Sequence, residues 1–248
     1  MARRHTLRMG CEAWRLARKV RLSLSGDLSM NLEPFAPYAE LAGQLLAGCA
    51  PSTDDGAHDL SHLQRVWANV RRLQREEGGD LQLLLAAVLL HDCVAVEKDS
   101  PLRSSASRLS AARAGEVLAG HGWPSERITA VRHAIEAHSF SAAITPTSLE
   151  ARILQDADRL DAIGLIGVAR CFHVSGRLGS ALYDAEDIDA RQRPLDDQRF
   201  ALDHFHTKLL GLAAGFQTAT GARLAGQRHA RMVAFLDAFR EETQPFEQ

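Results

Sequence analysis

The sequence predicts an all-α protein with a single helical domain. Aromatic residues make up only 6% of the 248 residues, whereas alanine and leucine are abundant. This composition favours helices, because β-rich cores use β-branched and aromatic side chains. Apolar residues recur at helical spacing along the chain, and neither an internal repeat nor a linker separates two hydrophobic cores. The chain is therefore long enough for one large helical domain.

The first three helices are predicted by their periodicity and by the residues that end them. A helix over 33–50 ends at Pro51, before a turn-rich stretch. A second helix over 59–77 has apolar residues at three- and four-residue spacing and ends at Gly78 and Gly79. The third, over 81–92, is apolar on nearly every side, so we expect it at the centre of the domain.

The remaining helices are separated by two polar loops. Residues 93–105 form the first loop and residues 176–194 the second, and loops of this kind are the expected lids of a site. Ser125 is predicted to cap the helix that follows Pro124. A long helix follows Pro146. The predicted helices are 106–120, 125–138, 150–170, 197–212 and 220–242.

The charge distribution divides the chain into a basic start and an acidic body. Residues 1–29 hold seven basic and two acidic residues, although the formal net charge of the chain is −2. We interpret 1–29 as a dispensable basic extension or a misassigned start before Met30, with a targeting or membrane-surface arm as the alternative. The domain is then expected over 30–248. The overall charge excludes a large basic surface, so no nucleic-acid partner is expected.

Cysteine usage and hydropathy indicate the compartment. The four cysteines form no C-x-x-C pair, which argues against a zinc knuckle or a disulfide scaffold and fits a reducing cytoplasm. The longest apolar run, 83–90, is much shorter than the ~20 residues that cross a bilayer. We therefore expect a cytoplasmic protein without a membrane partner.

Two carboxylates lie on the predicted apolar side of the helix over 150–170. At 100° per residue, that side contains Ile153, Leu154, Ala157, Leu165 and Val168. Asp161 points into its middle and Asp158 lies at its edge, while Gln155 and Arg159 are expected on the opposite side. A buried carboxylate is costly unless it is paired or binds a metal. From this helix alone, a metal site cannot be distinguished from a buried ion pair or a helix cap. Nor does it show which of Asp158 and Asp161 would be the metal ligand.

Histidines complete a pattern of metal-binding residues. His91 and Asp92 end the most apolar helix, and His62 lies near the start of the helix before it. Two imidazoles and two carboxylates suit one divalent ion, which would lower the pKa of bound water towards ~7. The candidate ions are Mn²⁺, Fe²⁺, Ni²⁺, Co²⁺, Zn²⁺ and Mg²⁺, with Mn²⁺ favoured.

A zinc peptidase is a competing interpretation of the same segment. His58 and His62 are four residues apart, as in the H-E-x-x-H motif of zinc peptidases. Asp59 stands where that motif requires glutamate, and its side chain is too short to serve well as the general base. The order of His62, His91, Asp92 and the later aspartate fits the other pattern better.

This order of residues resembles the HD-domain superfamily of metal-dependent phosphohydrolases. The segments HDLSHLQRVW, LLHDCVAVEK and QDADRLDAIG resemble its small stand-alone bacterial members, the YedJ/YpgQ-like group, over about residues 33–240. The resemblance implies a helical bundle with a central metal. The implied ligands are His62, His91, Asp92 and Asp158, with Asp158 rather than Asp156 or Asp161 as the fourth.

The resemblance also implies the reaction. It indicates hydrolysis of a phosphate ester or anhydride of a small molecule, most concretely a nucleotide such as a ribo- or deoxyribonucleoside triphosphate. The alternative is a module that senses a nucleotide or binds a partner without turnover. A sensor of this kind would normally lack a ligand, whereas all four are present, which favours an enzyme. The sequence does not indicate the oligomeric state.

Further residues are candidates for catalysis and substrate binding. Several HD enzymes place an acidic helper three residues after the HD aspartate, where this chain has Ala95; Glu97, Asp161 or no residue takes that role. We expect His138 to contact phosphate or to donate a proton. We expect His133 either to support a metal ligand through a hydrogen bond or to contact the substrate. The predicted catalytic residues are Asp92, Lys98, His133, His138 and Asp161. The predicted substrate-binding residues are His58, Glu97, Lys98 and Arg108.

Overall fold

The computed structural model describes residues 31–48, 60–96, 103–139 and 142–243. The residues from Glu33 onward form one compact unit. The described part of the chain is helical, and its single β-type contact is an isolated bridge between Ala181 and Phe200. The prediction of an all-α fold is confirmed.

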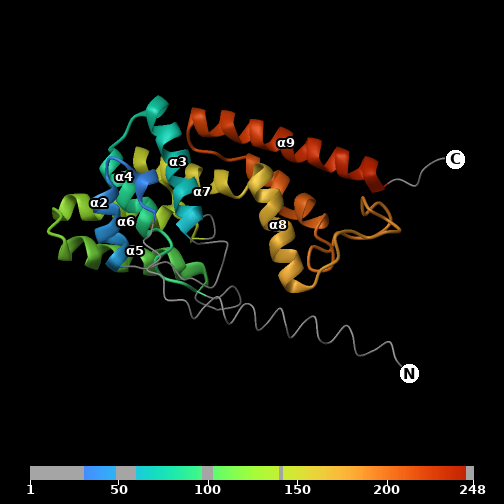
Figure 1. Ribbon diagram of the computed structural model, residues 1–248, viewed down its shortest axis with the longest axis horizontal. Helices are drawn as coiled ribbons and strands as arrows, with labels where there is room; N and C mark the ends of the chain where they lie inside the picture. The colour runs from blue at the N-terminus through green and yellow to red at the C-terminus, as the bar shows by residue number, and fades with distance from the viewer. Residues whose placement is uncertain (1–30, 49–59, 97–102, 140–141, 244–248) are drawn as a thin grey trace, which may run out of the picture. The chain divides into compact units, whose positions relative to one another are not determined.

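Helix α4 (Leu81–Leu90) is the central element, as its composition predicts. Every residue from Leu83 to Leu90 is buried, and α4 packs against α2, α3, α6 and α7 (Figure 1). Asp80 caps the helix by accepting a hydrogen bond from the Leu83 backbone N–H. Arg127 of α6 donates two hydrogen bonds to the same carboxylate at 2.7 and 3.1 Å. These contacts fix the start of α4, the helix that His91 directly follows.

The other helices of this bundle surround α4. They are α2 (Ala39–Gly48), α3 (Leu60–Glu77), α5 (Ala106–Gly120), α6 (Ser125–His138) and α7 (Leu149–Asp161). Helix α7 packs against α3 on one side and α6 on another, and α5 pairs with α6. The last turns of α4 and α7 therefore lie beside the first turn of α3, which brings three segments distant in sequence to one place.

Two details at helix starts differ from the prediction. The expected helix over 33–50 is a short 3-10 turn, Glu33–Phe35, followed by α2 from Ala39. Pro37 interrupts them because proline has no backbone N–H to donate. In α6, Ser125 is already helical and Pro124 is the capping residue, with no side-chain hydrogen bond, so the predicted serine cap is wrong.

The predicted helix over 150–170 is two helices. Helix α7 ends at Asp161, and α8 (Gly164–Leu178) begins after an extended Ile163. Gly164 has φ +75°, a conformation that ends a regular right-handed helix. Leu165 is 60% exposed rather than part of the apolar face. The single-helix prediction fails because one glycine changes the direction of the chain.

The C-terminal part packs around α8. Helix α8 continues to Leu178, so the second polar loop begins later than expected. The predicted helix over 197–212 is shorter and irregular, a π-helical segment Phe205–Leu209 followed by a 3-10 turn Leu210–Ala213. Helix α9 (Ala219–Thr243) packs against α8 and α7 (Figure 1). The rings that join these elements are Phe172, Tyr183, Phe205, Phe235 and Phe239.

None of the described helices combines the length and the hydrophobicity that crossing a membrane requires.

We predict that Leu85→Ala lowers the free energy of unfolding by roughly 2–5 kcal/mol, because Leu85 is fully buried in α4 and alanine leaves a cavity. Urea unfolding followed by circular dichroism measures the change. Leu109→Ala on the exposed side of α5 is the matched control and should cost far less. Equal losses for the two variants would contradict the central position of α4.

Candidate metal centre

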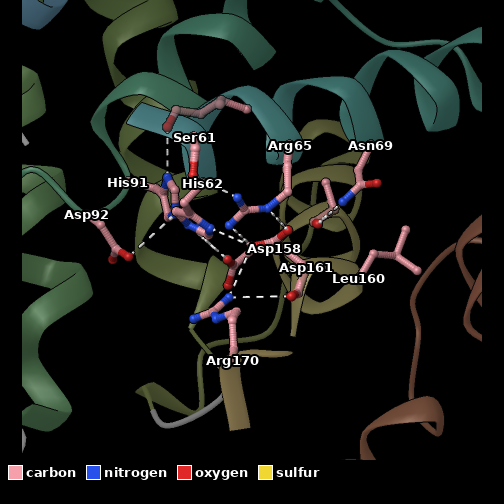
Figure 2. A network of polar contacts seen from close by, with 12 residues as sticks. Ser61, His62, Arg65, Asn69, His91, Asp92, Asp158, Leu160, Asp161 and Arg170 are labelled. Carbon is pink, nitrogen blue, oxygen red and sulfur yellow. Dashed lines mark hydrogen bonds and ion pairs between the residues drawn. The ribbon is translucent and has the colours of Figure 1, made fainter. Parts of the chain in front are cut away.

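Three helices bring four potential metal ligands together. His62 lies in the first turn of α3, His91 and Asp92 directly follow α4, and Asp158 lies in the last turn of α7. We call these four residues the metal-site cluster (Figure 2). The Nε2 atoms of His62 and His91 are 3.3 Å apart. An Asp158 oxygen lies 3.6 Å from the first and 3.9 Å from the second, and an Asp92 oxygen lies 3.6 Å from His91 Nε2.

The opposite ring nitrogens define how the two histidines are protonated. His91 Nδ1 lies 2.8 Å from the Val88 carbonyl oxygen, which can only accept a hydrogen bond. His62 Nδ1 lies 2.8 Å from the Asp161 carboxylate. Both Nδ1 atoms therefore carry the proton, and both Nε2 lone pairs point into the metal-site cluster. Burial lowers the pKa of His91, which favours the neutral imidazole that a metal requires.

This set of atoms fits a divalent cation. Two Nε2 lone pairs and two carboxylates face one another, an arrangement that is repulsive without a positive charge among them. Ligand atoms about 2.1 Å from one ion are separated by 3–4 Å, which agrees with the observed distances. His62, His91 and Asp92 alone already place three ligand atoms within 4.8 Å of one another. The side chains of Asp158 and Asp92 are 31% and 36% exposed, so the site faces solvent on the carboxylate side.

Asp161 holds His62 from behind. Its buried carboxylate accepts hydrogen bonds from His62 Nδ1 and from Arg65 Nε and Nη2 at 2.7 and 3.0 Å. Arg170 Nη1 donates to it at 3.1 Å. Burial by itself would raise the pKa of the Asp161 carboxyl, but the hydrogen bonds from His62 and Arg65 outweigh burial and hold that pKa well below its usual range. Asp161 therefore contacts the candidate ligand His62 from outside the metal-site cluster, as buried carboxylates behind metal-binding histidines do.

The end of α7 is held by two further polar contacts. Asn69 of α3 donates to the Ala157 carbonyl oxygen at 3.0 Å. Arg228 of α9 donates to the Leu160 carbonyl oxygen and, at 2.8 Å, to the Asn69 side chain. The Leu160 carbonyl oxygen also accepts the Ile163 backbone N–H at 3.3 Å, so Arg228 adds a donor from another helix. These bonds fix the backbone on both sides of Asp158.

His138 lies next to the metal-site cluster. Its ring packs edge-on against His91, with centroids 4.9 Å apart. Its Nδ1 donates to the Ile135 carbonyl oxygen, and its Nε2 lies 3.6 Å from an Asp92 oxygen. Burial favours the neutral imidazole, but the contact with Asp92 outweighs it and raises the pKa of His138. The structure thus places this predicted residue beside the cluster.

The remaining predicted site residues lie elsewhere or outside the described part. His133 accepts a hydrogen bond from the Thr147 backbone N–H at 3.1 Å, so it joins α6 to the segment before α7. Arg108 is exposed on α5, and no contact with the metal-site cluster is seen for it among the described residues. His58, Glu97 and Lys98 fall outside the described residues.

Three polar residues of α7 are buried for structural reasons. Gln155 donates to the Ala137 carbonyl oxygen, and Arg159 donates to the carbonyl oxygens of Ala214 and Gly215. Both side chains are buried, because other segments cover that side of α7. Asp156 accepts the backbone N–H groups of Gln217 and Thr218 just before α9, and the Thr218 hydroxyl in turn accepts the Gly221 N–H of that helix.

The two arginines that hold Asp161 were not among the predicted site residues. Arg65 lies three residues after His62 on the same face of α3, and this spacing is a signal that an isolated sequence contains. Arg170 had no such signal, because a continuous helix over 150–170 would place it two and a half turns from Asp161. Only the break at Gly164 brings the two side chains together.

We predict that Asp161→Asn weakens metal binding about 10–100-fold and costs roughly 3–5 kcal/mol of stability, because it removes the buried charge that orients His62. Titration with Mn²⁺ and urea unfolding measure the two effects. Asp156→Asn is the matched control, a second buried carboxylate on α7, and should lower stability while leaving the metal affinity of the folded protein unchanged. Unchanged metal affinity in Asp161→Asn would rule out the orienting role.

Comparison with known proteins places this geometry in a family. The HD domain family model matches residues 59–163. The YpgQ protein of Bacillus subtilis is 34% identical over 189 residues, which are 74% of this chain and 84% of YpgQ. The crystal structure of YpgQ in complex with ADP is similar with a TM-score of 0.63 at 29% identity, covering 84% of this chain and 96% of that one. An HD-superfamily hydrolase from Bacillus thuringiensis gives the same TM-score and identity, covering 82% and 96%. The chain belongs to the HD-domain superfamily of hydrolases.

Proposed function

We propose that this protein is a metal-dependent phosphohydrolase that cleaves a phosphate ester or anhydride of a nucleotide. The observation that supports it most is the convergence of the His62 and His91 Nε2 atoms and the Asp92 and Asp158 carboxylates at one place. A hydrolase of this superfamily is expected from the comparisons, and the similar YpgQ protein binds ADP. Together these support a nucleotide as the substrate class.

The metal-site cluster would hold one divalent ion, for which we favour Mn²⁺. Such an ion lowers the pKa of bound water and polarises a phosphoryl oxygen. The protein groups around it also favour an anionic substrate. Asp92, Asp158 and Asp161 carry three negative charges against the two positive charges of Arg65 and Arg170, and a divalent ion reverses the sign of this sum. The positive centre that results attracts phosphate.

His138 is proposed as the proton donor to the leaving group. Its Nδ1 is committed to the Ile135 carbonyl oxygen, so Nε2, which faces Asp92, is the atom that can hold and release a proton. Asp92 lies 3.6 Å from that nitrogen and stabilises the protonated imidazole. Asp161 is proposed as the residue that orients His62 rather than as the acidic helper, because His62 and two arginines contact its carboxylate. Glu97, Lys98 and His58 are proposed to contact the substrate from segments outside the described residues.

The experiment that tests this function measures metal-dependent turnover. Protein freed of metal is incubated with nucleoside mono-, di- and triphosphates, with and without Mn²⁺, and the release of phosphate and pyrophosphate is followed separately. We expect hydrolysis only with metal, and the product identifies the bond that is cut. Asp158→Ala should abolish the activity, while Asp237→Ala, an exposed aspartate on α9, should retain it. Binding of metal and nucleotide without turnover would instead identify a sensor.

We predict that His138→Gln lowers kcat about 10²–10⁴-fold with little change in metal content, because it removes the proton donor but none of the four ligands. Steady-state kinetics and metal analysis of the purified variant measure both quantities. His133→Gln is the matched control on the same helix, since its side chain contacts Thr147 instead. A kcat for His138→Gln within threefold of the wild type would remove His138 from the catalytic residues.

A further inference from the structure

Asp161 is held by two arginines, although one of them already satisfies it. Arg65 donates through Nε to one carboxylate oxygen and through Nη2 to the other, a two-point contact that matches the carboxylate geometry. His62 adds a third hydrogen bond. Arg170 adds only one atom, Nη1, which reaches the side chain at 3.1 Å and the Asp161 carbonyl oxygen at 3.4 Å. The charge of Arg170 is therefore in excess of what Asp161 needs.

The rest of the Arg170 guanidinium remains available. A guanidinium has five N–H donors, and within the described parts of the chain the hydrogen bonds of Arg170 all come from Nη1, none from Nε or Nη2. The side chain is 27% exposed, close to the 31% of the ligand Asp158. Figure 2 shows it pointing from its helix towards Asp158 and Asp161. Arg170 thus presents donors beside the exposed side of the metal-site cluster.

Helix α8 extends this cationic side away from the cluster. His173 and Arg177 follow Arg170 by three and seven residues, which places all three on one face of the helix. His173 and Arg177 are exposed. Seven residues of helix span about 10 Å. A row of polar and cationic groups of this length suits an extended chain of phosphates better than a single phosphate.

We propose that Arg170 is a substrate-binding residue that donates its Nε and Nη2 groups to phosphate oxygens of a nucleoside di- or triphosphate at the metal centre. This inference rests on the proposed function and names its substrate class and an anchoring residue. Arg65 lacks such available donors, because its Nε and Nη2 donate to Asp161 and its Nη1 donates to Ser61. Arg65 is a positioning residue for His62, whereas Arg170 contacts the substrate.

Substitution of the two arginines separates these roles. Arg170→Gln should raise KM for a nucleoside triphosphate about 10–100-fold, the loss expected for hydrogen bonds to a charged group, with Mn²⁺ affinity within twofold of the wild type. Arg65→Gln should instead weaken Mn²⁺ affinity about 10–100-fold and leave KM almost unchanged at saturating metal. Arg152→Gln, an exposed arginine on α7 that bonds only the Thr147 carbonyl oxygen among the described residues, controls for the loss of one positive charge.

Calorimetric titration of the Mn²⁺-loaded protein with ADP gives a readout that does not depend on turnover. We expect ADP to bind wild type and Arg152→Gln equally and Arg170→Gln at least tenfold more weakly. If wild type hydrolyses no nucleotide but shows this pattern with ADP, the proposed function fails while the binding role of Arg170 stands. If Arg170→Gln keeps full ADP affinity, or if wild type does not bind ADP, the inference is overturned. A loss of Mn²⁺ affinity in Arg170→Gln with unchanged ADP affinity would make Arg170 a second positioning residue.

Discussion

The hydrogen bond between the Asp161 carboxylate and His62 Nδ1 determines the chemistry of the site. It fixes the proton of His62 on Nδ1, so that the Nε2 lone pair points at His91 and Asp158. The bond requires an ionised carboxylate in a buried place, which is costly without compensation. Arg65 provides that compensation through two hydrogen bonds, and the pKa of Asp161 stays low as a result.

The position of Asp161 depends in turn on how the end of α7 is held. Asn69 of α3 and Arg228 of α9 bond carbonyl oxygens in the last turns of this helix. Asp156 binds the start of α9 from the other side. These contacts make α7 part of the packing of both neighbouring helices, so the fourth proposed ligand, Asp158, lies on a segment whose backbone is fixed.

The break after α7 brings Arg170 of α8 to the site. Had the helix continued, Arg170 would lie more than two turns beyond Asp161. Gly164 turns the chain with a positive φ that strains any other residue, and a Cβ there would lie 3.1 Å from the Arg228 side chain, which would have to shift. Helix α8 then returns Arg170 to the Asp161 carboxylate. One glycine therefore separates the helix that carries the proposed ligand Asp158 from the helix that we propose for the substrate.

The sequence by itself determined the helical class, most of the helix bounds and the position of the apolar α4, because periodicity and composition are local properties. It also identified His62, His91, Asp92 and Asp158 through a family pattern, and the structure brings these four side chains together. The helical projection alone left Asp158 and Asp161 equivalent, since it shows that a residue is buried but not what it contacts, and only the family resemblance favoured Asp158. The projection placed Gln155 and Arg159 on the side opposite the apolar face, without indicating that other segments bury them there. Only the tertiary structure decided these points, because the partners of Asp161, Gln155 and Arg159 come from segments 9 to 99 residues away in the chain.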